Sequence, residues 1–115
     1  MEYTPYPNNF QETINLSNYQ EYYLIKDNIV YIFLISRNDK EIFIQCKNYL
    51  ISFNYNDLSL LTNKFFNSIN KAYEFIYNNF EENKIIIKNI IINKEIILSI
   101  KSYEREIEIS LKYKQ

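Results

Sequence analysis

The stretch that decides the fold is residues 94–113, KEIILSIKSYEREIEISLKY. Two runs in which apolar and polar side chains alternate flank the short segment Ser102-Tyr103-Glu104-Arg105. An apolar side chain at every second position is typical of a β-strand with one face on a core and the other in water. In the second run, Ile107, Ile109, Leu111 and Tyr113 face inward, whereas Glu106, Glu108, Ser110 and Lys112 face outward. The stretch therefore predicts two antiparallel strands joined by a hairpin.

Five further strands are expected before this hairpin. An isoleucine-rich strand covers residues 84–92, and four more lie at about residues 22–25, 29–35, 42–47 and 49–55. The second of these four is apolar on both faces and is expected to be central. In the third, Ile42, Ile44 and Cys46 face inward, whereas Glu41, Gln45 and Lys47 face the other way; in the fourth, Tyr49, Ile51, Phe53 and Tyr55 share one face. Turns that usually use glycine are expected to use Asp27-Asn28, Asn38-Asp39, Asn48 and Asn93, because asparagine and aspartate tolerate positive φ.

The apolar period changes from 2 to 3.6 between the fourth and fifth strands, which predicts a pair of helices. Asn56 or Asp57 is expected to cap the first helix, which places Leu58, Leu61 and Phe65 on one side. Asn67 or Ser68 is expected to cap the second helix. The second helix carries one apolar stripe, made of Ile69, Ala72, Tyr73, Ile76 and Phe80, and is expected to end near Asn83.

The expected fold class is therefore mainly β (α+β). About seven antiparallel strands form a β-sandwich or a barrel-like sheet, and a helix-turn-helix is inserted between strands 4 and 5. Residues 1–18 contain two prolines and no apolar period, so they are expected to form a flexible N-terminal arm. Residues 19–115 are expected to form a single globular β-sandwich head domain with the inserted helix pair.

The composition argues against an enzyme. The chain has no glycine, no histidine and no tryptophan, a bias that codon usage in an AT-rich genome also favours. Glycine-rich phosphate loops and imidazole acid–base chemistry are thereby excluded. Asp27, Asp39 and Asp57 fall in turns or at a helix cap, and Cys46 falls on an inward face, where cysteine behaves as a small hydrophobe. No catalytic, cofactor-binding or metal-binding residue is expected, and no cofactor.

Charge and targeting signals narrow the expected partners. The net charge is −1 and the 13 basic side chains are scattered singly, so nucleic acid is not expected as a partner. The longest apolar run, residues 29–35, is far shorter than the roughly 20 residues that span a bilayer. The amino terminus lacks a signal-peptide pattern, and a single cysteine cannot form an internal disulfide. We expect an intracellular protein of the cytoplasm or cytoskeleton, with no membrane partner.

The twelve tyrosines point to protein contacts, because exposed tyrosines are enriched at protein interfaces. Tyr103 lies at the tip of the last hairpin, where an aromatic side chain has no core to join. The expected protein interface is therefore Tyr103 with its neighbours Ser102, Glu104 and Arg105; the alternative is a single exposed aromatic without a role.

The order of elements over residues 42–55, 57–80 and 84–113 resembles a known architecture. It resembles the head domain shared by the centriolar spindle-assembly scaffold protein and the non-homologous end-joining scaffold proteins. The resemblance implies a non-enzymatic dimeric scaffold whose head precedes a coiled coil in a longer protein. In the centriolar branch, an apolar residue at the tip of the last hairpin inserts into a partner head, and Tyr103 matches that place.

Three functions follow from these observations. The first is a protein–protein interaction or oligomerisation head that binds protein, most simply itself, as a homodimer or higher oligomer. The alternative is a module that binds a small ligand in an apolar pocket between helix pair and sheet, lined by Tyr73, Ile76 and Ile44. The third, an enzyme, requires clustered acids in a cleft.

Overall fold

The computed structural model describes residues 19–101 and 105–115. Its strands and helices follow one another in the order β1 (Gln20–Lys26), β2 (Ile29–Arg37), β3 (Ile42–Cys46), β4 (Tyr49–Phe53), α2 (Tyr55–Thr62), α3 (Ile69–Glu81), β5 (Ile85–Ile91), β6 (Glu95–Lys101) and β7 (Glu106–Tyr113). The seven strands form one sheet in the order β1-β2-β3-β4-β7-β6-β5, and each pair of neighbours is antiparallel.

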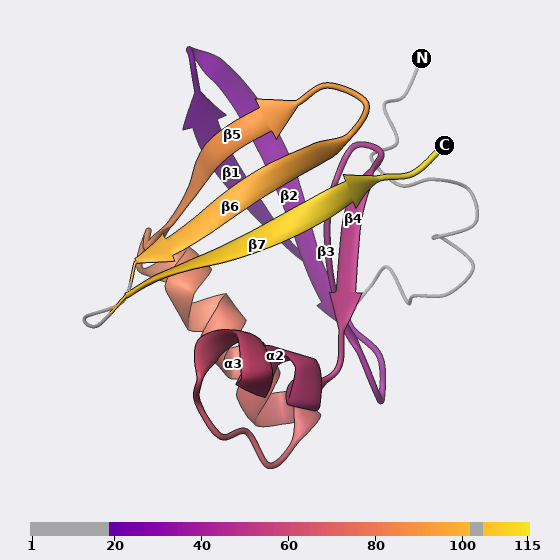
Figure 1. Cartoon of the computed structure of the whole chain (residues 1–115), viewed down its shortest axis with the longest axis vertical. Coiled ribbons are helices and arrows are strands. Elements are labelled where there is room, and N and C mark those ends of the chain that lie inside the picture. Colours follow the sequence, from indigo (N-terminus) through magenta and orange to yellow (C-terminus); the bar gives the residue numbers. More distant parts are fainter. Residues whose placement is uncertain (1–18, 102–104) are drawn as a thin grey trace.

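The sheet curls into a nearly closed barrel, because its two edge strands β1 and β5 approach each other. Figure 1 shows α2 and α3 gathered at one end of this barrel, with the β5–β6 hairpin at the opposite end. The predicted fold class is confirmed: a mainly β domain of seven antiparallel strands with two helices between β4 and β5.

The core fills the inside of the barrel and continues onto α3. Phe33, Ile44, Leu98 and Leu111 are completely buried there. The predicted apolar stripe of the second helix is confirmed, since Ala72, Ile76 and Phe80 are buried, with Ile69 and Tyr73 partly buried against the same core. Each fully buried Leu, Ile or Phe stabilises the folded chain by about 1.5–3 kcal/mol relative to exposure. The inner face of the sheet is thus formed by isoleucine, leucine and aromatic side chains together.

Within residues 19–101 and 105–115, six non-glycine residues adopt positive φ: Asp27, Asn28, Lys47, Asn63, Asn83 and Asn93. The predictions for Asp27-Asn28 and for Asn93 are therefore confirmed. In the turn between β3 and β4 the prediction was wrong, because Lys47 (φ 53°) and not Asn48 takes the left-handed conformation. Asn38 does not adopt positive φ either; its Oδ1 instead accepts the backbone N–H groups of Lys40 and Glu41, at 2.8 and 2.7 Å.

The start of α2 differs from the prediction. Asn54, not Asn56 or Asp57, is the N-cap, and its Oδ1 accepts the N–H of Asp57 at 2.8 Å. The Asp57 carboxylate in turn accepts the N–H of Asn54, which completes a capping box. Tyr55 was predicted on the inner face of the fourth strand, but it is the first residue of the helix. The reciprocal cap ends the strand two residues earlier than side-chain alternation indicated.

The ends of α3 agree with the prediction. The Ser68 side chain accepts the N–H of Lys71, so Ser68, and not Asn67, caps the helix. At the other end Asn83 adopts φ 57°, and the N–H groups of Asn83 and Lys84 donate to the carbonyls of Phe80 and Asn79. This pair of bonds satisfies two carbonyls that the helix itself leaves unpaired, with asparagine in the place that glycine usually occupies.

The predicted alternation of β3 is confirmed, since Ile42, Ile44 and Cys46 belong to the main core while Phe43 belongs to a separate cluster. The side opposite the core is nevertheless buried too, because every residue of β3 is buried and Gln45 is 1% exposed. The Gln45 Nε2 donates to the Lys47 carbonyl. The outer face of β3 is therefore covered as well as the inner face.

Candidate functional site

The predicted interface lies at the hairpin between β6 and β7. Ser102, Tyr103 and Glu104 fall outside the described residues, whereas Arg105 is described. The guanidinium Nη2 of Arg105 donates a hydrogen bond of 2.7 Å to the backbone carbonyl of Leu61, near the end of α2. The base of the hairpin is thus attached to the helix pair, although 44 residues separate the two partners in the sequence.

The end of α2 and the following loop carry large apolar side chains in water. Leu60 is 83% exposed and Phe65 is 86% exposed, while Leu61 is 37% exposed. The prediction that Phe65 shares one side of the first helix with Leu58 and Leu61 is wrong, because α2 ends at Thr62. The reason is Asn63, whose left-handed conformation (φ 56°) ends the helix before Phe65. Of the predicted three, only Leu58 is fully buried.

Phe66, the neighbour of Phe65, is the phenylalanine of this loop that is buried. It is 7% exposed, and its ring lies 5.5 Å from the Phe75 ring, centroid to centroid. Its N–H donates to Ser59 Oγ at 3.1 Å, and Ser59 Oγ donates to the Tyr55 carbonyl. These contacts fix the loop backbone, so Phe65 is presented to solvent from an anchored segment. We call Leu60, Leu61, Lys64, Phe65 and Arg105 the α2 surface.

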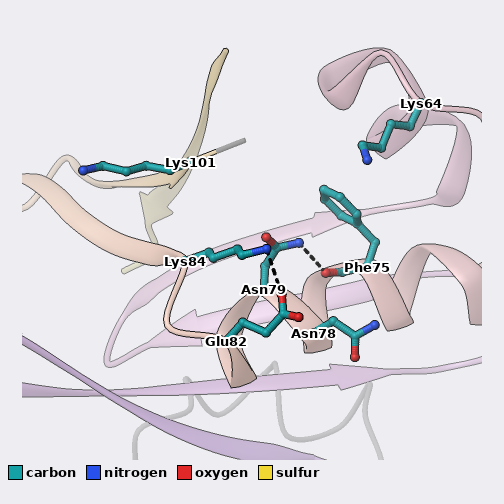
Figure 2. A pocket seen from close by; sticks show the side chains of 7 residues that line it. All are labelled: Lys64, Phe75, Asn78, Asn79, Glu82, Lys84 and Lys101. Atoms are coloured by element: carbon teal, nitrogen blue, oxygen red, sulfur yellow. Dashed lines mark hydrogen bonds and ion pairs between the residues drawn. The ribbon is translucent and has the colours of Figure 1, made fainter. Parts of the chain in front are cut away.

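A hollow of about 540 Å³ adjoins the α2 surface (Figure 2). It is lined by Lys64, Phe75, Asn78, Asn79, Glu82, Lys84 and Lys101. The Lys64 ammonium stands 5.2 Å from the Phe75 ring centroid, a cation–π distance. The Asn79 amide donates to the Phe75 carbonyl at 2.7 Å, which turns this side chain back onto its own helix.

The charge around the hollow is mainly positive. Three lysines line it against one carboxylate, Glu82, and that carboxylate forms an ion pair of 3.0 Å with Lys84. The backbone N–H of Lys101 donates to the carbonyl of Lys84, so the end of β6 and the turn after α3 are held together. With Arg105 beside them, these side chains give the helical end of the barrel a local excess of cations. Such a field attracts acidic groups.

The pocket predicted between helix pair and sheet is not where this hollow lies. Ile44 and Ile76 are completely buried in the core, and neither they nor Tyr73 line it. Tyr73 is half-buried beneath the Arg37 guanidinium, whose carbon lies 5.1 Å from the ring centroid. Burial raises the pKa of the Tyr73 hydroxyl above its ordinary value, so the side chain stays neutral.

The described acids and the cysteine show no arrangement typical of catalysis. Within residues 19–101 and 105–115, no three His, Cys, Asp or Glu side chains are grouped so that they could hold a metal ion. Cys46 is completely buried, and burial raises the pKa of its thiol to about 11. A thiol with that pKa is protonated at neutral pH and is a poor nucleophile. The same described ranges contain no helix of the length and apolarity that a bilayer span requires.

Sequence patterns identified Arg105 but missed Leu60, Lys64 and Phe65. Leu60 was outside the predicted helix stripe, and Phe65 was assigned to that stripe. The signal that was available is Asn63, since asparagine tolerates the left-handed conformation that ends a helix.

The described residues thus form a mainly β barrel with an attached helix pair, and one end of it carries an exposed apolar and cationic surface. No family model matches this chain, and no curated protein or solved structure matches it either.

Proposed function

We propose that this domain is a non-enzymatic protein–protein interaction module that associates with further copies of the same chain through the α2 surface. It acts as an oligomerisation head of the kind found in the scaffold proteins that the element order resembles. The observation that carries the proposal is the exposure of Leu60 and Phe65 on a segment whose backbone is anchored from both sides.

The exposure of these side chains supports a contact surface. Single exposed apolar residues are common on soluble proteins, but Leu60, Leu61 and Phe65 lie within six residues of one another. An aromatic side chain on a fixed backbone loses little conformational freedom when it binds. Phe65 is therefore suited to insert into a partner as the central anchor, with Leu60 beside it.

The charges support a second copy as the partner. The α2 surface and the adjoining hollow are locally cationic, while the chain as a whole has a net charge of −1. The remaining surface therefore carries an acidic excess that complements the cationic end. A contact between two different surfaces of the same chain is heterologous, and it produces rings or filaments rather than a closed dimer.

Tyr103 belongs to the same proposed contact. It lies two residues before Arg105, which is attached to Leu61. Residues at the tip of the β6–β7 hairpin and residues of the α2 surface can thus meet the same partner. This is the place at which the centriolar scaffold heads use an apolar hairpin residue.

Sedimentation velocity of the full chain over a wide concentration range tests the proposal. We expect concentration-dependent association that Leu60→Ser with Phe65→Ser weakens about 30-fold or more, because truncating a hot spot costs at least about 2 kcal/mol of binding free energy. Tyr103→Glu is expected to weaken association as well. Ile92→Ser is the matched control, since Ile92 is 81% exposed but lies in the turn after β5, at the far end of the barrel. A monomer at all concentrations, or equal effects of Ile92→Ser and the double variant, would refute the proposal.

The hollow supports a second candidate function, the binding of a small aromatic anion. Lys64, Lys84 and Lys101 supply positive charge and Phe75 supplies a ring face, in a volume within the range of ligand sites. Titration with 8-anilinonaphthalene-1-sulfonate tests it: Lys101→Glu is expected to weaken saturable binding, and Lys112→Glu, a lysine change on β7 away from the hollow, is the control. Equal binding by both variants would exclude this candidate.

A further inference from the structure

The β1–β2 hairpin carries a second group of exposed apolar side chains, on the outside of the barrel. Tyr22 and Leu24 pack against the main core, so the alternation along β1 points Tyr23 and Ile25 outward. The register of the two strands places Val30 opposite Ile25, on the same face of the sheet. Tyr23, Ile25 and Val30 are 61%, 71% and 54% exposed. The outside of this hairpin is thus an apolar patch in water.

A hollow adjoins this patch at the edge of the sheet. The seven antiparallel strands alternate in direction, so the two edge strands β1 and β5 run the same way and cannot close the barrel with an antiparallel ladder. A hollow of about 250 Å³ lies between β1 and the turn that leads from α3 into β5. It is lined by the acidic Glu21 and Glu81 and by the aromatic Tyr22, Tyr23 and Phe80, with no basic residue in its described lining. The hollow is therefore acidic and aromatic.

Tyrosine hydroxyls hold the two carboxylates of this hollow in place. Tyr22 donates to Glu81 Oε1 at 3.2 Å, and Tyr23 donates to Glu21 Oε1 at 2.9 Å. Burial and the neighbouring Glu81 carboxylate raise the pKa of the Tyr22 hydroxyl, so it keeps its proton and remains the donor. An ionised carboxylate has about four lone-pair positions, so each can accept further hydrogen bonds from a cation. We call Glu21, Tyr23, Ile25, Val30 and Glu81 the β1 surface.

The β1 surface and the α2 surface have a similar composition with opposite charge. The α2 surface combines exposed apolar side chains with the cations of Lys64 and Arg105, whereas the β1 surface combines them with two carboxylates. Contact of either surface with the same surface of another copy brings like charges together, which opposes binding. Contact between the two different surfaces pairs cations with carboxylates. Figure 1 shows the β1–β2 hairpin reaching the end of the barrel opposite α2, so two different copies can occupy the two surfaces at once.

We propose that the α2 surface of one copy docks on the β1 surface of the next copy. Phe65 packs against Tyr23 and Ile25, and the Lys64 ammonium reaches the carboxylates at the edge of the acidic hollow. This inference rests on the proposed function, because it names the partner of the α2 surface. An assembly of this kind has one unoccupied surface at each end, so it grows into a filament unless a ring closes it.

Mixing two defective variants of the full chain tests the proposal. Leu60→Ser with Phe65→Ser removes the apolar part of the α2 surface, and Tyr23→Ser with Ile25→Ser removes that of the β1 surface. Each double variant alone is expected to associate about 30-fold more weakly than the unchanged chain in sedimentation velocity. In an equimolar mixture, the first variant keeps an intact β1 surface and the second keeps an intact α2 surface. The mixture should therefore form a heterodimer, and nothing larger, at concentrations at which the unchanged chain associates.

Charge exchange provides a second comparison, which stands if circular dichroism shows that the serine changes unfold the hairpin. Glu21→Lys and Lys64→Glu are each expected to weaken association about fivefold, because each places like charges at the contact. An equimolar mixture of these two variants should regain the lost affinity, since every contact between unlike copies then pairs opposite charges. Ile92→Ser and Lys94→Glu, in the turn between β5 and β6, are the matched controls and should associate as the unchanged chain does.

The outcomes separate this inference from the proposed function. If the β1-surface variants associate normally while the α2-surface variants do not, the α2 surface is a contact but the β1 surface is not its partner. Defective variants that stay monomeric when they are mixed would also overturn the docking, because both surfaces would then belong to one symmetric contact. If the α2-surface variants associate normally, or if the unchanged chain is a monomer, the proposed function fails and this inference fails with it.

Discussion

Phe65 and Phe66 are neighbours in the sequence, yet the structure assigns them opposite environments. Phe65 is 86% exposed, whereas Phe66 is 7% exposed and packs against Phe75. We predict that Phe66→Ala lowers the free energy of unfolding by about 3 kcal/mol, the lower end of the range for a buried phenylalanine, because a loop site partly collapses around the cavity. Phe65→Ala should change it by no more than about 0.5 kcal/mol.

Urea denaturation followed by far-UV circular dichroism measures both values. A domain of this size is stable by roughly 5–15 kcal/mol, so the Phe66 variant should still fold and yield a complete transition. The same two variants separate stability from binding: Phe65→Ala should weaken self-association at unchanged stability. Equal loss of stability in the two variants, or a larger loss for Phe65, would refute the assignment of the loop and of the α2 surface.

Three further predictions concern caps and charges. Asn54→Ala should cost about 1 kcal/mol in denaturant unfolding through loss of the N-cap bond to Asp57, while Asn56→Ala should cost little. Asn83→Ala should destabilise the chain by about 1 kcal/mol and Asn83→Gly should not, because glycine and asparagine adopt the φ of 57° at a lower cost than alanine; equal effects would contradict this. The Glu95 carboxyl has a pKa below its ordinary 4.5, chiefly through the hydrogen bond from Lys112. Its contribution to stability is present above 4.5 and is lost as pH falls through the lowered pKa. The free energy of unfolding, measured by urea denaturation at a series of pH values from 7 to acid, should therefore fall less steeply with pH for Glu95→Gln than for the unchanged chain.

The strands and the second helix were predictable from local patterns. Residues 106–113 alternate strictly because one face of β7 meets the core and the other meets water, and the period of 3.6 over Ala72, Ile76 and Phe80 follows in the same way from one buried side. These elements can be predicted without knowing which segments they pack against, because the periodicity of apolar side chains reflects which side is buried. Fold class follows from their order and from the short hairpins.

The candidate site was only partly predictable. Arg105 was identified from its place in a hairpin, but its attachment to Leu61 depends on a contact across 44 residues. Phe65 was assigned to the wrong side because a single left-handed residue, Asn63, ends the helix, and period counting cannot detect that end. The burial of Gln45 could not be predicted, because the polarity of a side chain does not reveal that the outer face of its strand is covered.

The sequence by itself determined where the strands lie to within about two residues, which stripe of α3 is buried, and that most turns without glycine depend on asparagine and aspartate. Each of these is a local property of side-chain polarity and of φ preference. Only the tertiary structure decided how the sheet closes, that the hairpin base meets α2, and which face of β3 is covered. Those features depend on contacts between segments far apart in the chain, and no period or propensity of a single segment carries that information.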